Sequence, residues 1–176
     1  MRTLVLGGIR SGKSQWAEGQ LDAAAQQEPV RYMATGASPA ADVEWARRVA
    51  AHRERRPGRW LTTETTDVPA ALREDPTTAT LVDDIGGWLT AELDRCDAWN
   101  AGSAAPGINA LVAAVAAFAG PLALVSPEVG LTVVPATASG RRFADELGAL
   151  NQRLAATCDR VVLIVAGQPI TVKEPW

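Results

Sequence analysis

Five runs of mostly apolar residues recur along the chain, at 3–7, 30–34, 79–83, 122–126 and 160–165. Within each run the apolar residues tend to be continuous rather than alternating with polar ones. Such runs are typical of strands that are buried on both faces of a parallel sheet. A shorter run at 60–63 is a candidate for a further strand. The pattern therefore predicts a sheet whose central strands are covered on both sides.

Helical patterns separate these runs, at 14–25, 40–54 and 108–119. Strands that alternate with helices require crossover connections, which produce parallel pairing. The glycine, serine, proline and asparagine residues of 94–107 predict a loop between two helical segments. We therefore expect one α/β domain over residues 1–176, with three layers and a mostly parallel central sheet.

Composition narrows the classes of function. The chain has 176 residues, 47% of them hydrophobic, and a net charge of −3, so a duplex-binding surface is not expected. Its two cysteines are too far apart in sequence to suggest a disulfide framework or a zinc site. The first apolar run is too short for a signal peptide core or a membrane span. These features predict a soluble, cytoplasmic protein without nucleic acid or membrane partners.

The strongest chemical motif directly follows the first predicted strand. The stretch GGIRSGKS fits the pattern G-x-x-x-x-G-K-[ST] in full, between a strand and a helix. Its glycines let backbone amides surround phosphate oxygens, its lysine binds them, and its last hydroxyl is a ligand for Mg²⁺. The alternatives are a turn that binds nothing and a dinucleotide site, but the G-x-G-x-x-G pattern is absent. The predicted nucleotide-binding residues are Gly7, Gly8, Ile9, Arg10, Ser11, Gly12, Lys13 and Ser14.

A P-loop site also needs a carboxylate at the end of a neighbouring strand, to hold the metal ion. Asp83 and Asp84 close the run at 79–83, and Asp83 is our candidate because it follows the apolar residues directly. The alternative is that one of the two aspartates caps the helix that begins near Gly86. Both roles can coexist across the pair.

His52 is the only histidine of the chain. In a helix over 40–54 it shares a stripe with Trp45 and Val49, which favours ordinary packing. Against that, Arg53 and its neighbours Arg55 and Arg56 form a basic cluster in an acidic chain. Their field would attract a nucleotide phosphate and keep the imidazole neutral, and neutral imidazole is the nucleophilic form. Glu64, after the run at 60–63, is a candidate for contacting sugar, base or metal.

Eight segments carry a resemblance to a known family. They are GGIRSGKS from Gly7, YMATG from Tyr32, HRERRPGRWLTTE from His52, LVDDIGGWLT from Leu81, PEVG from Pro127, VVPATASGRRFAD from Val133, LGALNQRLA from Leu147 and VAGQPITVK from Val165. The chain resembles, nearly end to end, the bifunctional adenosylcobinamide kinase and adenosylcobinamide-phosphate guanylyltransferase family of cobalamin biosynthesis. The block that begins at His52 is far more specific than a P-loop.

The resemblance implies a P-loop fold related to recombination-type ATPases, and two reactions. The first phosphorylates adenosylcobinamide from ATP or GTP, and the second transfers GMP from GTP to that phosphate. It implies that His52 carries the guanylyl group, while Mg²⁺ as the cofactor is predicted by the phosphate loop itself. It also implies a homotrimer. Further nucleotide contacts would come from Gly36, Ala37, Ser38, Arg53, Glu54, Arg55, Arg56, Glu64 and Asp83.

Two positions and one short run depart from the family's usual residues. Pro127 and Thr137 stand where asparagine is usual, and the run from Asp84 to Gly87 replaces a more apolar one. These departures leave the phosphate loop, His52 and Asp83 intact. They change segments that the resemblance places on the corrinoid side or at subunit contacts. Two other functions remain open: another small-molecule P-loop kinase with a structural His52, and a nucleotide-gated binding protein without turnover.

Overall fold

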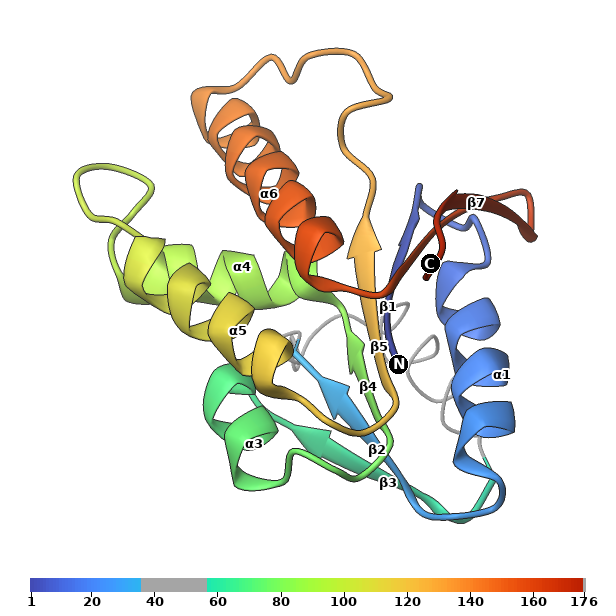
Figure 1. Ribbon diagram of the computed structural model, residues 1–176. Coiled ribbons are helices and arrows are strands. Elements are labelled where there is room, and N and C mark those ends of the chain that lie inside the picture. The colour runs from blue at the N-terminus through green and yellow to red at the C-terminus, as the bar shows by residue number, and fades with distance from the viewer. Residues whose placement is uncertain (36–56, 176) are drawn as a thin grey trace.

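The central feature of the computed structural model is a single sheet of seven strands, in the order β3-β2-β4-β5-β1-β6-β7 (Figure 1). The structure describes residues 1–35 and 57–175. Every neighbouring pair of strands is parallel except β6 and β7, which are antiparallel. The strands are β1 (Arg2–Gly7), β2 (Val30–Ala34), β3 (Trp60–Glu64), β4 (Thr80–Asp83), β5 (Leu122–Pro127), β6 (Arg160–Val165) and β7 (Gln168–Lys173).

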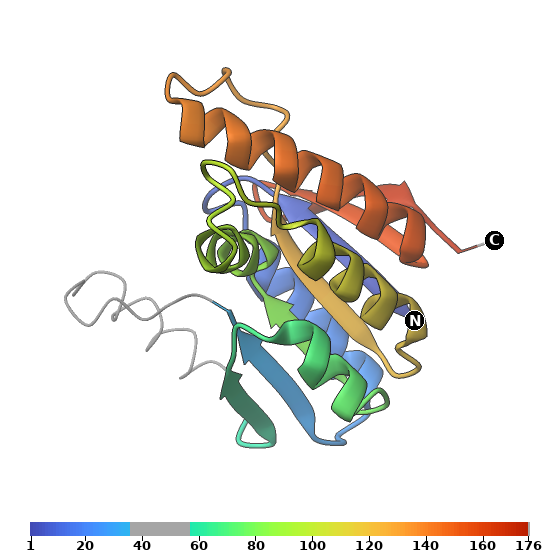
Figure 2. The same cartoon turned by 90° about the vertical axis from the view of Figure 1, so that its left-hand side faces the viewer.

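Helices cover both faces of the sheet and give the predicted three layers. In the described residues α1 lies on one face, and α3 to α6 lie on the other (Figures 1 and 2). The helices are α1 (Lys13–Ala25), α3 (Val68–Glu74), α4 (Ile85–Arg95), α5 (Ala105–Ala117) and α6 (Ala138–Thr157). The fold class expected from the sequence is therefore confirmed.

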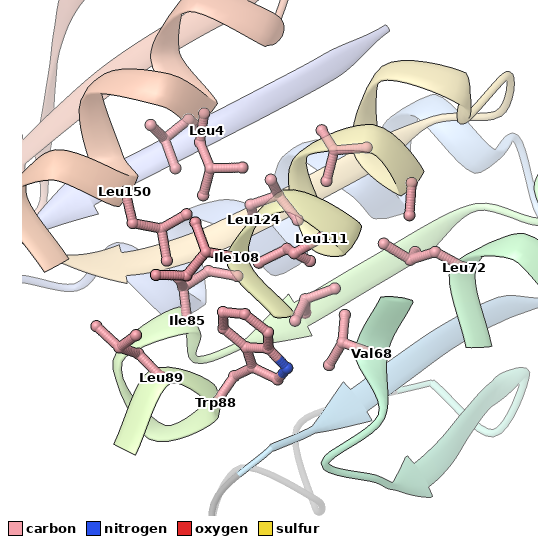
Figure 3. Packing of buried hydrophobic residues seen from close by; sticks show 14 of the residues in the cluster. Leu4, Val68, Leu72, Ile85, Trp88, Leu89, Ile108, Leu111, Leu124 and Leu150 are labelled. Atoms are coloured by element: carbon pink, nitrogen blue, oxygen red, sulfur yellow. The ribbon is translucent and has the colours of Figure 1, made fainter. Parts of the chain in front are cut away.

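Two hydrophobic clusters, one on each face of the sheet, form the core. Successive strand residues point to opposite faces, so Leu4 packs with the α3 to α6 side and Val5 with the α1 side. Both side chains are fully buried. Trp88 is among the largest buried side chains, and it packs in the cluster between the sheet and the helices (Figure 3). Burial on both faces is the reason that the central strands read as continuous apolar runs.

All six predicted strands are present, and those at 30–34 and 160–165 have the predicted bounds. The candidate strand at 60–63 is confirmed as β3, which continues to Glu64. It lies at one edge of the sheet, and four of its five residues are exposed. An edge position explains why its apolar signal is weak. The helix predicted at 40–54 lies outside the described residues.

The loop predicted at 94–107 is wrong at both ends. Helix α4 continues to Arg95, where the guanidinium bonds Glu92 one turn back at 2.6 Å. Helix α5 already begins at Ala105, so the intervening loop covers only 96–104. Pro106 lies in the first turn of α5, where the missing amide costs nothing because that amide has no helical partner. A proline that indicated a loop is therefore part of a helix start.

Strand β7 was not predicted. A two-residue turn, Ala166 and Gly167, joins it to β6, and both residues have positive φ, 50° and 78°. Two successive residues with positive φ are the geometry of a type I′ hairpin turn, which fits the twist of antiparallel strands. Gly167 between apolar runs was the signal in the sequence. The antiparallel pairing was missed because every other connection is a crossover.

Candidate functional site

The stretch 7–14 forms a tight loop from the end of β1 to the start of α1. A Cβ atom at Gly7 would collide with Oγ of Ser11 and lie 3.0 Å from the carbonyl oxygen of Ile164. The amide of Ser11 donates to the carbonyl oxygen of Gly8 at 3.2 Å, and Lys13 Nζ donates to the same oxygen at 3.3 Å. Packing against Ser11 and Ile164 therefore favours glycine at position 7.

Gly12 ends this loop with a φ of +91° and is the N-cap residue of α1. Its backbone lies against the β6–β7 turn, so that an added Cβ would be 3.3 Å from Cα of Gly167. The amide of Gly167 donates to the carbonyl oxygen of Ser11 at 2.8 Å. The β6–β7 turn thus packs against the phosphate loop and supports its shape. This supporting role was not predicted, because the two segments are far apart in the sequence.

Oγ of Ser11 is buried and has no hydrogen-bond partner among residues 1–35 and 57–175. A buried polar atom without a partner is costly unless something bonds it. It belongs to a loop that leads into the N-terminus of α1, where amides and the helix dipole favour an anion. The arrangement is that of an anion-binding loop.

Ser14 and Asp83 meet across the sheet. Oγ of Ser14 lies 3.3 Å from Oδ1 of Asp83, although the residues are 69 positions apart. The second carboxylate oxygen, Oδ2, accepts a 2.7 Å hydrogen bond from the hydroxyl of Tyr32 on β2. Tyr32 is only 5% exposed, so it fixes the carboxylate from within the core. The role of Tyr32 was not predicted, because no local pattern links it to Asp83.

The two aspartates have separate environments. Asp84 caps α4: its side chain accepts a hydrogen bond from the amide of Gly87. Burial raises the pKa of the Asp84 carboxyl, and the Gly87 amide opposes that shift. The backbone carbonyl oxygen of Asp84 accepts a hydrogen bond from the hydroxyl of Thr35 at 2.5 Å. Helix capping therefore falls to Asp84, which leaves Asp83 facing Ser14.

Glu64 lies at the same edge of the sheet. Glu64 on β3 is in register with Ala34 on β2, and Ala34 is in register with Asp83 on β4. Two strand spacings, about 10 Å, therefore separate the backbones of Glu64 and Asp83. The Glu64 side chain is exposed. The structure thus brings Lys13, Ser14, Asp83 and Glu64 to the carboxyl edge of the parallel strands, where open α/β sheets bind ligands.

The remaining predicted site residues lie outside the described residues, which omit 36–56. These are Gly36, Ala37, Ser38, His52, Arg53, Glu54, Arg55 and Arg56.

The unusual residues of the sequence have local structural reasons. A Cβ at Gly86 would lie 3.0 Å from Cγ of Pro127, so the bulk of Pro127 favours glycine at the start of α4. Thr137 is the N-cap of α6, where its hydroxyl accepts from the amide of Gly140 at 3.1 Å. The departures at Pro127 and Gly86 are therefore a packed pair rather than independent changes.

Comparison with known proteins fits this geometry. The family model described as "Cobinamide kinase / cobinamide phosphate guanyltransferase" matches residues 3–172. The chain belongs to this family, the CobU family. A CobU-family relative from Pseudomonas aeruginosa, "Bifunctional adenosylcobalamin biosynthesis protein CobP", is 42% identical over 99% of this chain and 99% of its own length. Relatives named CobU from Salmonella typhimurium and Escherichia coli are each 36% identical over 98% of this chain and all of their own length.

Solved structures show the wider fold of this CobU-family member. An ATPase from a bacterial type III secretion system superposes with a TM-score of 0.59 at 11% sequence identity. The match covers 92% of this chain, which spans about half, 50%, of that ATPase chain. At this identity the likeness shows the fold alone, an α/β fold around a mostly parallel sheet.

Two kinds of feature are absent from the described residues. No helix there is long and apolar enough to cross a membrane. No three or more His, Cys, Asp or Glu side chains come together there in a way that could hold a metal ion. The oxygen pair of Ser14 and Asp83 is smaller than such a cluster, and it suits Mg²⁺ that is shared with bound phosphates.

Proposed function

We propose that the chain phosphorylates the aminopropanol hydroxyl of adenosylcobinamide with ATP or GTP. It then transfers GMP from GTP to that phosphate, which releases pyrophosphate and gives adenosylcobinamide-GDP. The observation that carries this proposal is the match to the CobU family over residues 3–172. The phosphate loop, with Ser14 beside Asp83, supplies the nucleotide chemistry that both reactions need.

In phosphoryl transfer, the residues of the phosphate loop would bind and position the transferred group. The backbone amides of 8–14 would surround the β- and γ-phosphates, and Lys13 would neutralise their charge. The Ser14 hydroxyl and the Asp83 carboxylate would hold Mg²⁺, with Tyr32 orienting the carboxylate. When bound, Mg²⁺ lowers the cost of charge that develops on the transferred group. The aminopropanol oxygen attacks the γ-phosphorus, the bond from that phosphorus to the leaving nucleoside diphosphate breaks, and the hydroxyl proton passes to solvent.

His52 carries GMP in the second reaction. The neutral imidazole nitrogen attacks the α-phosphorus of GTP, a P–N bond forms, and the P–O bond to pyrophosphate breaks. A phosphate oxygen of the acceptor then attacks the same phosphorus, and the P–N bond breaks. The further nucleotide contacts proposed from the resemblance are Gly36, Ala37, Ser38, Arg53, Glu54, Arg55, Arg56 and Glu64.

We further propose a homotrimer in the cytoplasm. Members of the resembled family commonly assemble as trimers, and a relative 42% identical to this chain is named an adenosylcobalamin biosynthesis protein. Sedimentation of the purified protein at several concentrations tests the trimer: a single species of three times the chain mass supports it, and a monomer contradicts it.

Label transfer tests the assignment of His52. The protein is incubated with GTP labelled at the α-phosphate and Mg²⁺, then denatured and resolved from free nucleotide. We expect a protein label that is acid-labile and base-stable, as a phosphoramidate is, and that is absent from His52→Ala. A label that persists in His52→Ala contradicts the nucleophile.

Turnover separates the alternative functions. Wild-type protein with adenosylcobinamide and GTP should release pyrophosphate and form a GDP-linked corrinoid. Phosphorylation without any label on protein would favour a simple small-molecule kinase with a structural His52. Nucleotide binding without turnover would favour a nucleotide-gated binding protein.

A further inference from the structure

A groove of about 470 Å³ opens between α6, the segment from β5 to α6, and strands β1, β6 and β7. The strands contribute Leu6, Val161 and Val172, and the β5–α6 segment contributes Val133 and Val134. Val133 is 91% exposed and Val134 is 73% exposed. The β5–α6 segment arches beyond the carboxyl end of β5 and returns to the start of α6 (Figures 1 and 2). None of the described nucleotide-site residues lines this groove.

The groove is continuous with the phosphate loop. Leu6 lines it, and the next residue, Gly7, begins the loop. Glu128 also lines it, and the amide of Glu128 donates to the carbonyl oxygen of Gly7 at 3.1 Å. A molecule in the groove can therefore reach the carboxyl edge of the sheet at the position where the phosphate loop starts.

The residues that line the groove combine apolar surface with groups that can form hydrogen bonds to amides. Thr132 and Gln152 supply a hydroxyl and an amide group beside the valines. Arg141 also lines the groove, and its Nη1 donates to the carbonyl oxygens of Pro135 at 3.1 Å and Ala136 at 2.9 Å. Both bonds use Nη1, and they hold the guanidinium against the β5–α6 segment. The N–H groups on Nε and Nη2 are not used in these two bonds.

Hydrogen bonds between α6 and the end of β5 fix the position of one wall of the groove. Oδ1 of Asn151 accepts from the hydroxyl of Ser126 at 2.6 Å, and its Nδ2 donates to the carbonyl oxygen of Pro127 at 3.0 Å. Asn151 and Ser126 are both buried. These bonds tie the middle of α6 to the end of β5, which places the helix side of the groove relative to the phosphate loop. A preformed site of this kind loses less entropy when a ligand binds.

We propose that this groove binds the acceptor of both reactions, one side of the corrinoid, with its hydroxyl arm directed to the phosphate loop. The inference rests on the proposed function. A corrinoid is a large apolar macrocycle that carries amide arms, and it needs apolar contact together with amide-bonding groups at its edge. Its volume exceeds that of the groove, so the exposed Val133 and Val134 would extend the contact beyond it.

A filling substitution tests the groove. Gly148 lines it from α6, and an added Cβ there meets no atom within 4 Å, so Gly148→Trp fills the groove without a clash at its own Cβ. Gly19 on α1 is the matched control, since a Cβ there also meets no atom within 4 Å and α1 lies on the other face of the sheet. Both substitutions replace a helical glycine by the same residue, and Gly148→Ala serves as the small step in the series.

We expect Gly148→Trp to raise KM for adenosylcobinamide at least tenfold, and Gly148→Ala and Gly19→Trp to change it less than twofold. Labelling of the protein by GTP, which needs no corrinoid, should stay as in wild type for all three variants. An unchanged KM in Gly148→Trp overturns the proposal. Lost labelling in that variant also overturns it, because the substitution would then act on the nucleotide site.

Two further outcomes separate a subunit contact in the groove from a failure of the proposed function. If Gly148→Trp changes the sedimenting mass while KM is unchanged, the groove is a contact between copies of the chain and the proposal is wrong. If wild-type protein does not use adenosylcobinamide, the proposed function itself fails. Direct binding of adenosylcobinamide to wild type and to Gly148→Trp, measured by equilibrium dialysis, separates weaker binding from slower chemistry.

Discussion

Gly12→Ala tests whether the β6–β7 turn sets the shape of the phosphate loop. Alanine at a φ of +91° costs about 1–2 kcal/mol. Its Cβ would lie 3.3 Å from Cα of Gly167, close enough to displace the turn and weaken the 2.8 Å bond from Gly167 to Ser11. That bond is worth about 0.5–1.5 kcal/mol. Reduced freedom of the unfolded chain offsets about 0.4–1 kcal/mol.

The net loss of unfolding free energy is therefore about 2 kcal/mol, which corresponds to a fall in Tm of about 4–8 °C in a chain of this size. Urea denaturation followed by circular dichroism measures the first quantity, and a thermal scan measures the second. Gly8→Ala is the matched control in the same loop, because a Cβ there meets no atom within 4 Å. Equal stability of the two variants would refute the bracing role of the turn.

Two more predictions concern charged groups far from the site. Hydrogen bonds from Arg2 lower the pKa of Asp159 from 3.8 to about 2, so this contribution to stability is complete above about pH 4 and is lost as the pH falls toward 2. Asp159→Asn should lose about 1 kcal/mol at pH 7, with a deficit that shrinks on acidification; a deficit independent of pH between 7 and 2 would contradict the linkage. Lys173 Nζ donates to the carbonyl oxygens of Ala155, Ala156 and Cys158 at the end of α6, at 2.9, 3.3 and 2.6 Å, so Lys173→Met should lower the unfolding free energy by about 1–2 kcal/mol in urea titrations. An unchanged midpoint for Lys173→Met would show that these bonds add nothing.

The two aspartates at the end of β4 show how local and tertiary information divide. Sequence position favoured Asp83 as the residue that faces a bound metal, and it left open the alternative that one of the two aspartates only caps the next helix. The structure decides the geometry: Asp84 accepts from Gly87, and Asp83 approaches Ser14 and Tyr32. Neither contact of Asp83 is local, since its partners lie 69 and 51 residues away.

The sequence by itself determined the positions of six of the seven strands, the three-layer class and the phosphate loop. These follow from local pattern, because a strand buried on both faces must be continuously apolar and a loop that wraps phosphate needs glycines at fixed spacing. It failed at 94–107, where Pro106 begins a helix, and at β7, whose residues are mostly exposed on a sheet edge. Neither segment buries enough apolar side chains to give its sequence the hydrophobic periodicity of a helix or a strand.

Only the tertiary structure decided the strand order and the contacts made across it. The order β3-β2-β4-β5-β1-β6-β7 places β1 beside β5 and β6, so the phosphate loop meets Gly167 of the last hairpin and Glu128 after β5. The groove beside α6 likewise draws its lining from five separate elements and segments. Contacts between residues more than 100 positions apart depend on which strands pair, and that pairing is set by packing of the whole sheet rather than by any local pattern.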